Sequence, residues 1–146
     1  MDIPTSDIEF WDLDGDGREE LAVIEGFHGN NVAVFKEEMG SYVRALDLPA
    51  AFGHVLWAGP ILGRPALIVG SRAERKALTL YRLQAGDDGK LFVEQQAELD
   101  QGQAPAQITV LEDGRTLLTT NHDVGELAKY TLSCKDSPAD ATKGDS

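Results

Sequence analysis

Residues 11–21, with the sequence WDLDGDGREEL, combine side chains that are suited to bind a cation. Asp12, Asp14 and Asp16 occupy alternate positions, and Glu20 follows four residues after the last of them. Carboxylates this close repel one another unless a hard cation lies among them, and Ca²⁺ accepts six to eight oxygen ligands at about 2.3–2.6 Å. The two intervening glycines allow a tight curl of the backbone. The segment therefore predicts a calcium loop.

The spacing distinguishes this loop from an EF-hand, which needs a bidentate glutamate at its twelfth position. Counted from Asp12, the twelfth residue is Val23, and the apolar run 21–24 has already begun. The last acidic ligand is instead the ninth residue, Glu20. A backbone carbonyl near Arg18 is expected to point at the same centre. The predicted metal ligands are Asp12, Asp14, Asp16, Arg18 and Glu20, and an acidic turn without an ion is the alternative.

Short strands must position this loop. Ile8 and Phe10 belong to an apolar segment that enters it, and the nearly continuous apolar run 21–26 leaves it. Further strands are predicted at 32–35 and 42–46, because alternating apolar residues there are separated by polar turns. No window has a sustained helical period. The sequence therefore predicts an all-β protein.

The pattern recurs along the chain. Trp57 follows Trp11 by 46 residues, Tyr81 follows Phe35 by 46, and Tyr130 follows Tyr81 by 49. A period of about 45–50 residues with four short strands is typical of β-propeller blades. We therefore predict an all-β partial β-propeller of about three blades, at 6–48, 53–99 and 104–134, with a β-sandwich as the alternative. Residues 135–146 are polar and broken by proline, which predicts a disordered tail in place of a last strand.

Only the first unit retains the acidic loop. The corresponding turn of the second unit, 58–63, has no carboxylate, and the acidic turn 112–114 of the third is too short to enclose an ion. We therefore predict one Ca²⁺ with a structural role. Three blades do not close a ring. The chain is accordingly expected to be the C-terminal part of a longer propeller, with the remaining blades or self-association covering its open edges.

The spacing D-x-D-x-D-G-x-x-E-L, carried by residues 12–21 and leading directly into a strand, resembles the FG-GAP/VCBS repeat of integrin-like β-propellers. In that family the calcium loop joins the first two strands of a blade. The resemblance implies a calcium-stabilised propeller module that binds carbohydrate or a protein partner.

Polar residues are expected to gather on the propeller face opposite the calcium loop, in the turns between second and third strands and before Trp57. Imidazoles beside a carboxylate can perform acid–base catalysis or hold a transition metal. Arginine can bind an anionic or polyol ligand through its fork of donors. Polar turns without any ligand are the alternative. The candidate catalytic residues are His28, His54 and His122, and the candidate ligand-binding residues are Arg72, Asn121 and Glu126.

Short phrases at 27–31, 53–59, 69–72 and 121–130 resemble a group of bacterial and fungal VCBS-type propellers that includes aldos-2-ulose dehydratase-like proteins. The dehydratase-like proteins of that group act on keto-sugars, so the resemblance implies a sugar-handling scaffold. Two function classes therefore remain: a binding module, or a dehydratase or lyase in which a histidine abstracts a proton next to a carbonyl. Convergence of the three candidate histidines would favour catalysis.

Charge and composition exclude several other classes. The net charge of −12 argues against nucleic acid or an anionic membrane as partner, because both bind basic surfaces. Cys134 is the only cysteine, so we expect no internal disulfide. A single cysteine does not distinguish an oxidising from a reducing compartment. The chain shows no leader pattern and no apolar run that could span a membrane. Neither a G-x-S-x-G elbow nor a P-loop occurs.

Overall fold

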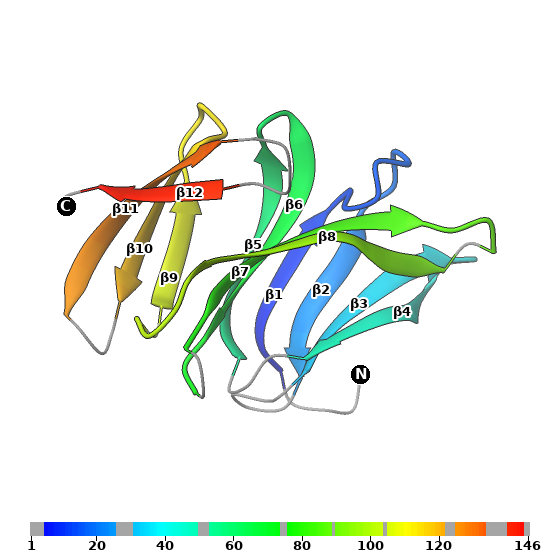
Figure 1. Ribbon diagram of the computed structural model, residues 1–146. Coiled ribbons are helices and arrows are strands. Elements are labelled where there is room, and N and C mark those ends of the chain that lie inside the picture. Colours follow the sequence, from blue (N-terminus) through cyan, green and yellow to red (C-terminus); the bar gives the residue numbers. More distant parts are fainter. Residues whose placement is uncertain are drawn as a thin grey trace.

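The computed structural model describes residues 5–25, 31–49, 53–73, 76–88, 90–103, 105–121, 125–133 and 140–144, which form strands and connections with no helix among them. They build three antiparallel sheets of four strands, each paired in chain order (Figure 1). The first contains β1 (Thr5–Trp11), β2 (Glu20–Glu25), β3 (Asn31–Glu38) and β4 (Ser41–Pro49). The second contains β5 (Gly53–Ile61), β6 (Arg64–Ser71), β7 (Leu78–Ala85) and β8 (Leu91–Asp100). The third contains β9 (Pro105–Val110), β10 (Thr116–Asn121), β11 (Glu126–Ser133) and β12 (Asp140–Gly144).

The second sheet lies between the other two and buries both of its faces (Figure 1). Leu67 and Val69 of β6 pack against the first sheet, whereas Ala66 and Ile68 pack against the third. Successive side chains of a strand point to opposite faces, so a strand that is buried on both sides needs an uninterrupted apolar run. Residues 66–69 supply that run, which explains why this strand occupies the centre of the molecule.

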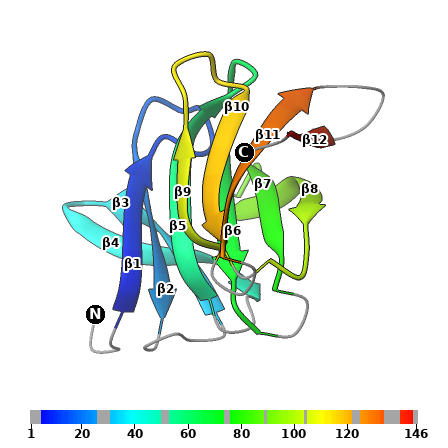
Figure 2. The same cartoon turned by 90° about the vertical axis from the view of Figure 1, so that its left-hand side faces the viewer.

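The first strands of the sheets lie side by side, β1 next to β5 and β5 next to β9 (Figures 1 and 2). Asp7 joins the first two of these strands, because its Oδ2 accepts a hydrogen bond from the Leu56 amide at 2.8 Å. On the outer side, the Tyr130 hydroxyl donates to Asp100 Oδ2 at 2.6 Å and joins the second sheet to the third. Sheets stacked around adjoining first strands are the blades of a β-propeller. The predicted partial propeller of three four-stranded blades is thus confirmed.

The third blade is complete, so the prediction that it lacks a fourth strand and that 135–146 is a disordered tail is wrong for residues 140–144. Strand β12 pairs antiparallel with β11, with Thr142 opposite Thr131. An edge strand needs backbone hydrogen bonds on one side only and can be short and polar. The segment 140–144 therefore has no apolar periodicity by which it could be recognised. Residues 134–139 and 145–146 lie outside the described part of the chain.

The strand register separates true correspondences between blades from accidental ones. An aromatic residue of each third strand lies opposite a leucine of the second strand, in the pairs Phe35–Leu21, Tyr81–Leu67 and Tyr130–Leu117. The two tryptophans do not correspond, although they are spaced equally. Trp11 lies opposite Glu20, before that leucine, whereas Trp57 lies opposite Ile68, after it. The predicted correspondence between Trp11 and Trp57 is therefore wrong. Strand β1 ends at Trp11, whereas β5 continues past Trp57 to Ile61.

The face of the first sheet that points away from the second is apolar and partly exposed. Ile8 and Phe10 lie opposite Val23 and Leu21, which belong to a small buried cluster on this face. The Tyr42 ring centroid lies 6.2 Å from that of Phe10. Ile8, Phe10 and Tyr42 are 46–48% exposed. We call this surface the outer face of the first blade.

Gly70 of β6 marks a close approach between the second and third blades. A Cβ at this position would lie 2.6 Å from Val55 Cγ1 and 2.9 Å from Pro105 Cγ. Gly70→Ala should therefore lower the free energy of unfolding by about 1–3 kcal/mol, because the packed interface must shift. Urea denaturation measures the loss. Gly86→Ala is the control, since its nearest contact is the Asp88 carboxylate at 3.1 Å, and equal losses in the two variants would contradict the prediction.

Candidate metal centre

The connection between β1 and β2 brings the predicted carboxylates together. Gly15 and Gly17 have φ values of 77° and 89°, in the left-handed region that favours glycine. These turns fold residues 12–19 back on themselves above the pair formed by Trp11 and Glu20. Ligand oxygens of four side chains consequently lie within 4.8 Å of one another, and they belong to Asp12, Asp14, Asp16 and Glu20.

Backbone amides of the loop orient the aspartates. Asp12 accepts hydrogen bonds from the amides of Asp16 at 3.0 Å and Gly17 at 2.8 Å. Asp14 Oδ1 accepts a further one from the Asp16 amide at 3.1 Å. The Arg18 amide donates to Asp16 Oδ1 at 2.8 Å. Each carboxylate keeps additional lone pairs, so the loop is preorganised and still able to bind a cation. A contribution of the Arg18 carbonyl stays a prediction.

Glu20 differs from the aspartates because it is buried. The residue is 1% exposed, and its Oε2 accepts a hydrogen bond from the Leu13 amide at 2.5 Å. Its second oxygen, Oε1, is buried without a hydrogen-bond partner among the described residues. Burial, together with the charges of Asp14 and Asp16, raises the pKa of Glu20 to about 8. A buried carboxyl oxygen without a partner is costly, and a cation that displaces the proton of this carboxyl would satisfy it.

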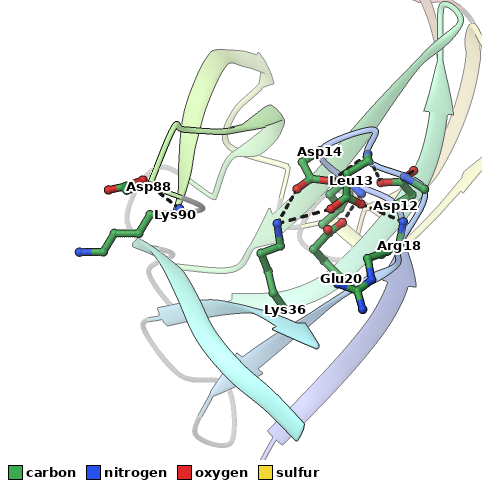
Figure 3. A network of polar contacts seen from close by, with 10 residues as sticks. Asp12, Leu13, Asp14, Arg18, Glu20, Lys36, Asp88 and Lys90 are labelled. Carbon is green, nitrogen blue, oxygen red and sulfur yellow. Dashed lines mark hydrogen bonds and ion pairs between the residues drawn. The ribbon is translucent and has the colours of Figure 1, made fainter. Parts of the chain in front are cut away.

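Lys36 of β3 reaches the same loop (Figure 3). Its Nζ lies 2.9 Å from Asp14 Oδ2 and 3.6 Å from Asp16 Oδ2. Burial raises the pKa of Asp14, but hydrogen bonds from Lys36 and from the Asp16 amide outweigh this effect and hold that pKa below its usual value. The hydrogen bond to Asp14 in turn raises the pKa of Lys36. The ammonium therefore stays charged beside the carboxylates at neutral pH.

The donor set of the loop suits a hard cation. The four converging side chains offer only carboxylate oxygens, which are preferred by Ca²⁺ and Mg²⁺, whereas imidazole and thiolate favour transition metals. Ca²⁺ tolerates irregular coordination by many oxygens, while Mg²⁺ demands near-octahedral geometry and retains waters. Three carboxylates of the loop and a fourth at the start of β2 therefore suit Ca²⁺ better than Mg²⁺. This site can hold a structural divalent ion at the junction of two strands.

A second group of polar side chains lies at the opposite end of the first strands. His54 is near the start of β5, whereas the acidic loop follows the end of β1, which runs beside β5 in the same direction (Figure 1). His54 lines a groove of about 330 Å³ together with Asp7, Glu9 and Gln107. Burial and the charge of Asp7 raise the pKa of Glu9. Asp7 and Glu9 were not predicted, although their alternation with Ile8 and Phe10 places them on the face opposite those apolar residues.

The other predicted ligand residues do not line this groove. Asn121 Nδ2 donates to Glu126 Oε1 at 3.0 Å, so this pair closes the β10–β11 connection. Both residues line a separate open pocket of about 360 Å³. Arg72 directly follows β6, at the same end of the sheet as His54. His28 and His122 lie outside the described residues, so the convergence of the three histidines is not tested.

A comparison of the chain with protein-family models finds no matching family, and a comparison with curated proteins finds no match. Among the residues that the structure describes, no helix is long and apolar enough to cross a membrane. The acidic loop and the groove around His54 are therefore the features of the molecule that point to a function.

Proposed function

We propose that this protein is a calcium-stabilised β-propeller module of the FG-GAP/VCBS type. Ca²⁺ would bind Asp12, Asp14, Asp16 and Glu20 and fix the junction of β1 and β2. The observation that carries the proposal is the buried, unpartnered Oε1 of Glu20 within a group of carboxylates whose oxygens lie within 4.8 Å. An ion bound to the folded state but not to the unfolded chain stabilises the fold.

Calcium titration of the purified protein tests this site. Isothermal titration calorimetry should detect one ion per chain, and the Tm should rise in calcium relative to EDTA by about 3–5 °C for each kcal/mol of added stability. Asp16→Asn keeps an acceptor for the Arg18 amide but removes the charge, and should weaken calcium binding at least about 10-fold.

Asp113→Asn is the matched control, because Asp113 likewise accepts backbone hydrogen bonds in a turn, from Arg115 and Thr116 at 2.9 Å. This variant should bind calcium like the wild type. Absence of calcium-dependent heat together with an unchanged Tm would refute the proposed site.

We further propose that the groove around His54 binds a polar ligand, with carbohydrate as the class that it suits best. Support comes from the presence of an imidazole, an amide and two carboxylates in one groove of about 330 Å³. In ligand-binding sites, a small number of convergent polar groups orients the ligand. A dehydratase or lyase with His54 as base is the alternative. Glycan-binding measurements on wild type and Gln107→Ala test the first, and turnover of a keto-sugar tests the second.

We also propose that partners cover the outer face of the first blade. Ile8, Phe10 and Tyr42 expose an apolar surface there, of the kind that usually marks an interaction site. Further propeller blades or a second copy of the chain would bury it. Light scattering after size-exclusion chromatography tests this, and a stable, strictly monomeric species of 146 residues would contradict it.

A further inference from the structure

We propose that Lys36 is an exchangeable cation built into the acidic loop. Its ammonium binds Asp14 and Asp16 when no metal ion is present and competes with the ion for these oxygens, which lowers the affinity of the site. This inference rests on the calcium site proposed above. The Nζ distances of 2.9 Å and 3.6 Å place the ammonium against the two aspartates. Glu20 Oε1, buried and unpartnered, remains available to a second cation.

The surroundings of Lys36 allow its ammonium to leave. The Asp14 side chain is fully buried, whereas the Lys36 side chain is 16% exposed. Lysine carries a compact charge on a flexible stem, so the ammonium can move while the stem stays packed. Lys36 also lines a groove of about 460 Å³ that contains Glu38 and Asp88, and Figure 3 shows Asp88 and Lys90 across from it. These carboxylates provide an alternative environment for a displaced ammonium.

The second blade supplies independent support, because it places a cation at the same position. Lys36 follows Phe35, which lies opposite Leu21, and Arg82 follows the corresponding aromatic residue of β7. The Arg82 guanidinium is buried and donates to backbone carbonyls around the β5–β6 turn, namely those of Ile61, Arg64 and Pro65. That turn has no carboxylates and needs no exchange. In both blades, therefore, the third strand delivers a positive charge to the junction of the first two strands.

The Lys36 ammonium and a divalent ion compete for Asp14 because both are positively charged. A divalent ion that binds Asp14 would lie within a few ångströms of the ammonium, and like charges this close repel strongly. Removing the ammonium should therefore strengthen calcium binding about 10-fold or more, which corresponds to about 1.4 kcal/mol of binding free energy. It should also destabilise the metal-free fold, because the buried Asp14 carboxylate would lose its partner.

The test compares the wild type with Lys36→Met and Lys36→Gln by calorimetric titration with calcium and by Tm in EDTA. Both variants should bind calcium about 10-fold more tightly, and both should melt lower in EDTA but gain more from calcium. Two variants are used so that one remains if the other fails to fold. Lys90→Met, which removes a lysine from the same groove, is the control, and its calcium affinity should stay within about 2-fold of that of the wild type.

Calcium binding by the Lys36 variants that is equal to or weaker than in the wild type would overturn this inference and leave the calcium site intact. Tighter binding by Lys90→Met to the same extent would also overturn it, because the effect would then be general to the groove. Absence of calcium binding in wild type and Lys36 variants alike would overturn the calcium site and this inference together.

Discussion

Replacing Arg82 with methionine should lower the free energy of unfolding by about 3 kcal/mol or more. Arg82 is 4% exposed, and its guanidinium donates to three backbone carbonyls at 3.0–3.1 Å. Methionine fills similar space but removes all three of these donated hydrogen bonds, and each buried polar group left unsatisfied costs about 1–3 kcal/mol. Urea denaturation followed by circular dichroism measures the loss.

Arg64→Met is the matched control, because it removes a guanidinium from the same turn. The Arg64 side chain is 50% exposed and forms an ion pair with Glu94 at 2.9 Å. Exposed pairs of this kind contribute about 0–1 kcal/mol, so the control should stay close to the wild type. A loss in Arg82→Met no larger than that in Arg64→Met would show that the three carbonyls find other donors.

The features that could be predicted from the sequence are those that depend on the spacing of residues within a short segment. The alternate aspartates and the following glutamate predicted which side chains converge, because two glycines with left-handed backbone leave a short loop little other choice. The nearly continuous apolar run at 21–26 predicted a strand, and residues 20–24 of β2 are buried. The recurrence of Phe35, Tyr81 and Tyr130 at intervals of 46 and 49 residues predicted that a four-stranded sheet is repeated along the chain.

The features that could not be predicted depend on register and on contacts between strands. Lys36 enters the acidic loop only because β3 pairs with β2 so that Phe35 lies opposite Leu21. Strand β12 exists because β11 offers it an unpaired edge. Arg82 carried a signal that was available, since a single arginine within the apolar strand 78–83 indicates a buried guanidinium with dedicated acceptors.

The pH dependence of the metal-free protein follows from Glu20. Burial and the charges of Asp14 and Asp16 raise its pKa to about 8, whereas the unfolded chain has the ordinary value of 4.5. Between these values the folded protein holds a proton that the unfolded chain has released. Stability should therefore fall as the pH rises through this window, by up to about 1.4 kcal/mol per pH unit. Glu9, whose pKa is raised by burial and by Asp7, acts in the same direction.

Calcium bound at the proposed site should oppose this decline in stability, because the ion would bind the Glu20 carboxylate and displace its proton. In EDTA the free energy of unfolding should be higher near pH 5.5 than near pH 7.5, and the gain from calcium should grow over the same interval. Urea denaturation at each pH, with calcium and with EDTA, measures both. Glu20→Gln should flatten the slope in EDTA and remove the calcium gain, whereas Glu9→Gln should reduce the slope only in part and keep that gain. A metal-free wild type that becomes more stable toward pH 7.5, with the same slope in Glu20→Gln, would show that the buried carboxyl is already ionised without a metal ion.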